Sequence, residues 1–200
     1  MTSKMAHLLA ELRREMNGAV VGSMRYYGAE YGLNYGVSIP TIRSMGRNES
    51  KNHRFAKYLF LQEVRELRMI SLWFADPKEV EGELDFWARG IINSEIAEEA
   101  AFVLLSRVQN IDEWLLSESE LLQYCAVMAI CGRDNIDLST LKPRLIELLA
   151  HNPALLPKAI IALLDRALRQ GGRDEVSLFL EESPSNGACR NIDEEIVWRM

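Results

Sequence analysis

The chain has 200 residues and a mass of 22.8 kDa, enough for one domain that buries a sizeable core without disulfides or metal. Its apolar fraction of 48% and charged fraction of 26% exclude a disordered tail, a collagen-like chain and a small disulfide scaffold. No apolar run reaches the roughly 18–20 residues that span a bilayer, and the N-terminus lacks a signal-peptide core. We therefore expect a single domain over residues 1–200, cytoplasmic and without membrane contact.

The cysteines and histidines are too widely spaced to form a zinc knuckle, a redox CxxC pair or another ligand pattern. We expect reduced, mostly buried thiols, no metal site and no cofactor. The residues concerned are Cys125, Cys131, Cys189, His7, His53 and His151.

The net charge of −6 conceals an asymmetry between the two ends of the chain. Residues 1–70 hold 11 Lys and Arg against 6 Asp and Glu, whereas residues 71–200 hold 12 against 23. A basic front and an acidic back are consistent with a nucleic-acid patch at one end. Chance clustering of charges on solvated helix faces is the alternative.

Apolar residues recur at three- and four-residue spacing, which predicts helices throughout and no strand. Ser3 and Ser38 are candidate N-caps, and Pro40 favours a helix start. Helix pairs recur about every 35–45 residues, the spacing of HEAT-like units, although a compact orthogonal bundle gives a similar pattern. The predicted helices are 3–16, one from about 19, 38–45, 51–61, 64–74, 78–91, 95–108, 120–131, 140–150, 154–170, 174–182 and 192–198.

The stretch 26–36 carries four tyrosines and three glycines, which break the helical pattern and predict a loop or a frayed helix end. The tyrosines are suited either to stacking on nucleobases or to packing against the first helices. They are Tyr26, Tyr27, Tyr31 and Tyr35.

Four short segments go beyond a generic helical pattern: 35–43 (YGVSIPTIR), 66–78, 114–118 (WLLSE) and 158–160 (KAI). Their residues and their order resemble the AlkD-type DNA alkylation repair family over roughly residues 20–182. The resemblance implies an all-α, right-handed superhelix, or α-solenoid, of HEAT-like repeats with a concave DNA-binding face.

Active members of that family are glycosylases that excise cationic alkylated purines without a metal. The resemblance implies an Asp flanked by Trp side chains and an Arg at the lesion. A carboxylate and aromatic faces stabilise a cationic base and the oxocarbenium-like sugar that develops, and an Arg holds phosphate.

This sequence departs from the family at those positions. The Asp aligns with Glu98, which keeps a carboxylate, whereas the aromatic cage and the Arg are lost. Because such contacts contribute as a unit, we expect little or no activity. We also expect the Glu98 carboxylate to be exposed or hydrogen-bonded at a helix start, and Tyr124 to lie beside the groove. The degenerate positions are Ser94, Leu121, Gln123, Tyr124 and Ala162.

The three glutamates Glu95, Glu98 and Glu99 also fit a purely structural interpretation, because carboxylates are favoured near a helix N-terminus. Residues 71–131 hold 3 Lys and Arg against 12 Asp and Glu. Such a surface would repel the DNA backbone unless these carboxylates all lie on the convex face.

The densest basic run is a candidate phosphate-contact patch, with two solvated helix faces as the alternative. Its members are Arg43, Arg47, Lys51, His53, Arg54 and Lys57.

The leading hypothesis is a diverged, non-catalytic member of the family that binds DNA, weakly and through the backbone, or a protein partner on its concave face. The alternative is a weak or altered DNA glycosylase that excises alkylated purines through Glu98.

Overall fold

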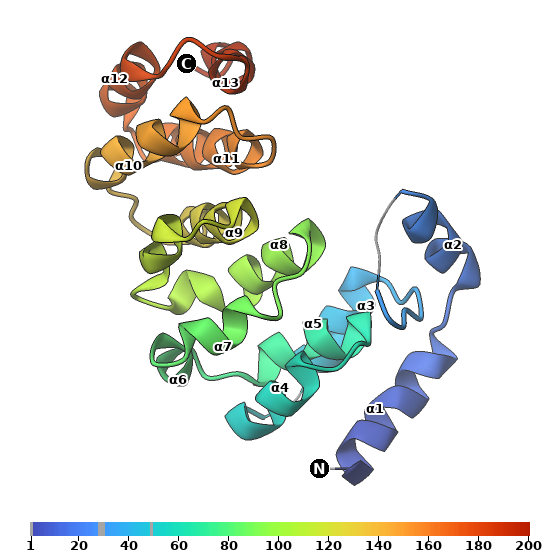
Figure 1. Ribbon diagram of the computed structural model, residues 1–200. Coiled ribbons are helices and arrows are strands. Elements are labelled where there is room, and N and C mark those ends of the chain that lie inside the picture. The colour runs from blue at the N-terminus through green and yellow to red at the C-terminus, as the bar shows by residue number, and fades with distance from the viewer. Residues whose placement is uncertain (1, 28–30, 49) are drawn as a thin grey trace. The chain divides into compact units, whose positions relative to one another are not determined.

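The computed structural model describes residues 2–27, 31–48 and 50–200, and these form helices with no strand (Figure 1). An isolated bridge pairs Leu33 with Val64. The all-α prediction is therefore confirmed. The helices are α1 Thr2–Arg14, α2 Gly18–Tyr26, α3 Ile39–Arg47, α4 His53–Phe60, α5 Arg65–Phe74, α6 Pro77–Glu81, α7 Leu84–Ala88, α8 Ser94–Val103, α9 Glu120–Cys131, α10 Leu138–Ala150, α11 Leu156–Arg169, α12 Arg173–Glu182 and α13 Gly187–Val197, with 3-10 helices η1 Leu105–Arg107 and η2 Ile111–Leu116.

Local capping explains several helix starts. The Ser38 hydroxyl accepts a hydrogen bond from the Thr41 N–H, and Pro40 stands in the first turn of α3, as predicted. Asn52 caps α4 in the same way through the Phe55 N–H. The expectation for Ser3 was wrong, because this residue lies inside α1 rather than at its cap.

The predicted helix over 78–91 was also wrong, because the chain forms two short helices there. Gly82 ends α6, and α7 begins at Leu84. The break lets Val80 and Leu84 both reach the core: they are 0% and 7% exposed. The apolar spacing predicted a helix through this stretch but did not reveal the turn at Gly82.

The first compact unit, Met1–Leu104, is built around α5. Helices α1, α3, α4 and α8 all pack on α5, and Leu67, Ile70 and Phe74 are essentially inaccessible to solvent. Burial of this apolar surface is the main force that assembles the unit.

Within this core, Glu66 on α5 is fully buried and anchors the loop before α3. Its carboxylate accepts the Tyr35 N–H at 3.1 Å and the Val37 N–H at 3.2 Å, and Arg65 Nη1 donates to it at 3.1 Å. The Tyr35-Gly36-Val37 segment is therefore held by a structural contact. Gly36 has φ +71°, a backbone conformation that favours glycine.

The second compact unit, Leu105–Met200, has α9 and α11 at its centre. Both helices are lined by buried small and branched side chains, and α13 packs on α11. Glu120 at the start of α9 accepts the Leu156 N–H at 2.9 Å, which links α9 to the first turn of α11. The chain thus divides into two compact units. The single domain expected over 1–200 stays a prediction.

Candidate nucleic-acid interface

Glu98, which the sequence resemblance matches to a catalytic Asp, lies on α8 in the first unit. Asn93 caps this helix by accepting the Ile96 N–H at 3.0 Å. Ser94, Glu98 and Phe102 follow at four-residue spacing, so they share one face of α8. Glu98 is half-buried, and Phe102 is 58% exposed.

The two neighbours of Glu98 in the acidic cluster are neutralised by arginines. Arg65 Nη2 lies 2.5 Å from Glu95 Oε1, and Arg43 Nη2 lies 2.7 Å from Glu99 Oε2. Tyr31 also donates its hydroxyl to Glu95. Burial raises the pKa of Tyr31, and the bond to Glu95 raises it further. This part of the surface is therefore less acidic than the residue count indicated.

The remaining family-aligned positions lie in the second unit. Gln123 is buried, and its side-chain amide donates to the Ser117 carbonyl at 2.6 Å. Tyr124 is 0% exposed and packs in the core, with Lys158 Nζ 5.9 Å from its ring centroid. The expectation that Tyr124 lies beside a groove is contradicted by this burial. Leu121 and Ala162 are half-buried on α9 and α11.

Three members of the predicted basic patch are occupied by contacts within the first unit. His53 is 8% exposed, and its Nδ1 accepts the Asp76 N–H at 3.2 Å. The proton of neutral His53 therefore sits on Nε2, which faces Glu83 at 3.1 Å. Lys57 Nζ lies 2.7 Å from the same carboxylate, and Arg43 is paired with Glu99.

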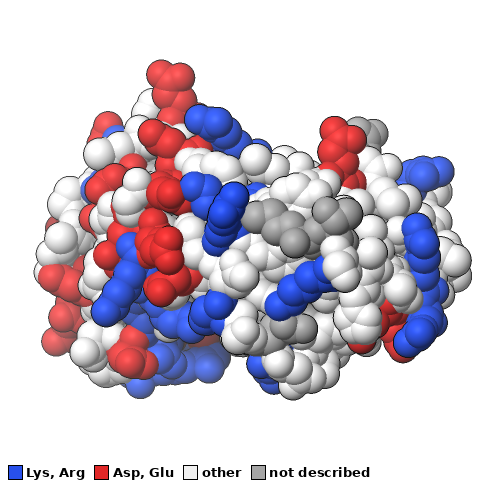
Figure 2. Space-filling model, turned by 90° about the horizontal axis from the view of Figure 1, so that it is seen from below, with Lys and Arg blue, Asp and Glu red and all other residues white. Residues whose placement is uncertain are grey.

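The other three members, Arg47, Lys51 and Arg54, are exposed at the end of α3 and the start of α4. The Arg47 guanidinium lies over the Trp73 ring at 5.2 Å, and Lys51 donates to the Trp73 carbonyl at 2.7 Å. Figure 2 shows Lys and Arg side chains on one face in several separate groups, with uncharged and acidic side chains between them. On that face the positive charge is therefore divided into local groups.

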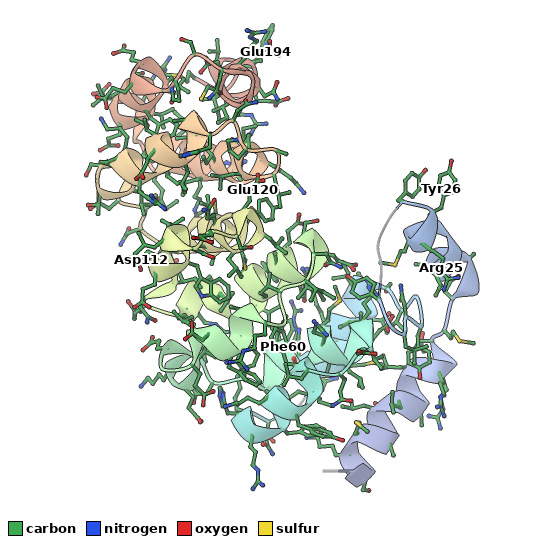
Figure 3. The ribbon with its side chains drawn as sticks, in the orientation of Figure 1. Arg25, Tyr26, Phe60, Asp112, Glu120 and Glu194 are labelled. Atoms are coloured by element: carbon green, nitrogen blue, oxygen red, sulfur yellow. The ribbon has the colours of Figure 1, made fainter. Side chains whose placement is uncertain are left out.

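The tyrosine-rich stretch divides between solvent and core. Tyr26 and Tyr27 are 83% and 81% exposed and contact each other edge to face. Figure 3 shows Tyr26 and Arg25 at the end of α2. Tyr35 is buried, and residues 28–30 of the stretch lie outside the described residues.

The structure also contains a cavity that the sequence did not reveal. Arg65 and Arg68 line it together with Tyr31 and Glu63. Arg68 is 8% exposed and donates to the Gly90 carbonyl at 2.9 Å and the Gln62 carbonyl at 3.1 Å. Burial lowers the pKa of Arg68. Helical spacing placed both arginines on a helix but gave no sign that their guanidinium groups are buried.

Two further searches concern the described ranges only. Within 2–27, 31–48 and 50–200, no group of three or more His, Cys, Asp or Glu side chains is arranged to hold a metal ion. None of the helices described there has the length and apolar character required to cross a membrane.

The described part of the chain is thus an all-helical protein with no strand. The family model described as "DNA alkylation repair enzyme" matches residues 8–189, so the chain belongs to this family. No curated protein matches the sequence.

A solved structure has a similar fold, with a TM-score of 0.72 and 15% sequence identity. The match covers 97% of this chain and 94% of the other. That structure is described as "a new family of proteins related to the HEAT-like repeat DNA glycosylases with affinity for branched DNA structures". It confirms the HEAT-like, all-helical fold that the sequence predicted.

Proposed function

We propose that this protein binds DNA through Arg47, Lys51 and Arg54 and does not excise bases. The observation that carries the proposal is the division of the basic run. Arg43 and Lys57 are paired with carboxylates, and His53 is buried. The three exposed members are Arg47, Lys51 and Arg54. Exposed Lys and Arg bind DNA by neutralising phosphates and releasing counterions. Membership of the DNA alkylation repair family and a structural relative with affinity for branched DNA support DNA as the ligand.

The positions where the family carries its lesion contacts support the non-catalytic part of the proposal. Gln123 and Tyr124 are buried and packed in the second unit, and Ser94 and Ala162 are small. None of the four offers the exposed ring or guanidinium that would hold a cationic base. Loss of several members of a catalytic set removes most of its rate enhancement.

A glycosylase that works through Glu98 is the second candidate. It is favoured by the half-buried position of Glu98 on the outward-facing stripe of α8, where the family's Asp aligns. A protein partner, a concave binding face and a cytoplasmic location stay predictions from the sequence.

The test compares binding of a linear duplex and a four-way junction by fluorescence anisotropy between 50 and 200 mM KCl. We expect wild-type binding to weaken with salt, with a log–log slope of about −2 to −3 for three phosphate contacts. The triple variant Arg47→Glu, Lys51→Glu, Arg54→Glu should lose measurable binding.

A matched control carries the same charge change on other exposed cations: Lys78→Glu, Arg89→Glu, Arg173→Glu. This control variant should retain most of the affinity for DNA, because the proposal depends on the position of the exposed cations and not on the net charge. Equal losses in the two triple variants, or unchanged binding by the first, would refute the assigned surface.

A further inference from the structure

Phe102 is a large aromatic side chain that lies outside the hydrophobic core. It lies near the end of α8 and is 58% exposed, whereas its neighbours Ala101 and Val103 are buried. A single exposed apolar residue is ordinary on a protein surface. Phe102 differs because a charged group from another helix is fitted against its ring.

That group is the guanidinium of Arg43 on α3, whose Cζ lies 4.4 Å from the centroid of the Phe102 ring. Arg43 is fixed in turn by Glu99, to which Nε donates at 3.1 Å and Nη2 at 2.7 Å. Glu99 is 2% exposed, so it is itself held rigidly in the core. The ring of Phe102 is therefore held by a chain of contacts that begins in the interior of the unit.

The charge of Arg43 is balanced by Glu99, so Arg43 acts here as a positioning residue and not as a phosphate contact. Burial of Glu99 and its bonds to Arg43 raise the cost of moving either side chain. A ring that is pre-positioned loses little conformational entropy when a flat ligand stacks on it.

The surroundings of Phe102 contain both a carboxylate and cations. Glu98 lies four residues before it on the same face of α8. Arg47 lies four residues after Arg43 on α3, so the two arginines share a face of that helix. Arg47 and Lys51 both contact Trp73, Arg47 at the ring and Lys51 at the backbone carbonyl. Arg43 contacts Phe102 on α8, and Arg47 lies about one turn further along α3, so a strand bound at Arg47 would pass near α8.

We propose that Phe102 is a stacking platform for an unpaired nucleobase, held in place by Arg43. The inference rests on the proposed function and adds the kind of DNA recognised: DNA with an extrahelical or unpaired base, in preference to perfect duplex. The occupant is a nucleobase because the site combines an exposed flat ring with neighbouring cations that fit phosphate, which is how proteins hold single strands. An apolar protein segment would use the ring but not Arg47 and Lys51.

The experiment uses the full chain and two DNA probes that differ by one base: a perfect duplex and the same duplex with a single bulged 2-aminopurine. Affinity is measured by anisotropy, and stacking by quenching of 2-aminopurine fluorescence. Phe102→Ala should reduce the preference for the bulged probe about tenfold, the scale expected for one lost base–ring stack. It should also abolish the quenching, and Phe102→Trp should restore both.

Leu61→Ala is the matched control, because Leu61 is a 50% exposed apolar residue of the same unit. It should leave both the preference and the quenching unchanged. Thermal melts of each variant show whether folding is intact, and Phe102→Trp keeps the test decisive even where Phe102→Ala is less stable.

The inference and the proposed function fail differently. If Phe102→Ala keeps the preference and the quenching, the stacking platform is wrong, while loss of binding in the Arg47, Lys51, Arg54 variant still supports the proposed function. Equal weakening of both probes by Phe102→Ala also overturns the platform, since it indicates a general surface contact. A wild-type protein that binds neither probe at low salt overturns both.

Discussion

Arg43 on α3 donates hydrogen bonds to the carboxylate of Glu99 on α8 from two nitrogen atoms, Nη2 at 2.7 Å and Nε at 3.1 Å. The two residues are 56 positions apart in the chain. Glu99 is 2% exposed and the Arg43 side chain 32%. The pair joins two helices that both pack on α5, and it gives a buried carboxylate the partner that its burial requires. The bond to Glu99 raises the pKa of Arg43, so this residue stays charged throughout the working range.

Removing only the arginine should be costly. Arg43→Met leaves Glu99 buried without its ion-pair partner, and we expect the free energy of unfolding to fall by about 2 kcal/mol. This value lies below the usual range for fully buried pairs because Arg43 is partly solvated. The double variant Arg43→Met, Glu99→Met should recover most of the loss in urea unfolding. A double variant as unstable as the single one would contradict this explanation.

Gly90 should not tolerate a side chain. A Cβ atom there would lie 2.1 Å from the ring of Phe60, the residue labelled in Figure 3. We expect Gly90→Ala to destabilise the protein by about 1–3 kcal/mol through overpacking. Gly82→Ala is the control, because its new Cβ would meet nothing closer than 3.8 Å. It should be neutral or slightly stabilising in the same thermal unfolding measurement.

The pH dependence of stability should carry a signature of Glu83. The hydrogen bond from Lys57 lowers the pKa of Glu83, and that from His53 lowers it further. A carboxylate with a lowered pKa stabilises the fold above its unfolded pKa, here 4.5, and loses this contribution as pH falls through the folded value. Glu83→Gln should therefore be less stable at pH 7 by about 0.5 kcal/mol, since the pair is partly solvated.

This difference between Glu83→Gln and wild type should shrink as the pH is lowered below about 4.5. Chemical unfolding at several pH values measures it. Glu79→Gln, which alters an exposed carboxylate on α6, should leave the profile unchanged. A constant difference between pH 7 and pH 3 would assign the effect to packing and not to ionisation.

The glycosylase alternative has its own test. The purified protein should release neither N7-methylguanine nor N3-methyladenine from alkylated DNA above background, because the sequence resemblance implies that the family's aromatic cage and Arg are replaced here. Chromatography of the released bases provides the measurement. Enzyme-dependent release that disappears in Glu98→Gln would establish the alternative and reject the non-catalytic proposal.

Glu98 should also behave as a partly solvated residue in stability measurements. We expect Glu98→Ala to change the free energy of unfolding by less than about 1 kcal/mol, as for other sites outside the core. Glu99→Ala, one residue along the same helix, should cost clearly more, because Glu99 is 2% exposed and paired with Arg43. A fall of several kcal/mol in the free energy of unfolding of Glu98→Ala would contradict this and indicate that the Glu98 carboxylate is desolvated, as a catalytic carboxylate would be.

The sequence by itself was sufficient for the helical class, most helix positions and the family. Apolar residues at three- and four-residue spacing indicate which face of a helix is buried, and a cap such as Ser38 marks where a helix begins. These are local signals, carried by residues close together in the chain. The break at Gly82 escaped detection because the same apolar spacing runs through both α6 and α7.

Only the tertiary structure decided which charges are available. The sequence alone does not distinguish the paired or buried members of the basic run from its exposed members. The first group is Arg43, His53 and Lys57, and the second is Arg47, Lys51 and Arg54. In the same way, the sequence does not distinguish Glu99 from Glu98. The difference comes from partners 26 to 56 positions away, Glu83 and Glu99, which are brought near by the packing of helices and not by any local pattern. The same long-range packing buried Tyr124 and left Phe102 exposed beside Arg43. Because an ion pair depends on atoms a few ångströms apart, only the folded chain determines which cations are paired with a buried or nearby carboxylate and which are exposed.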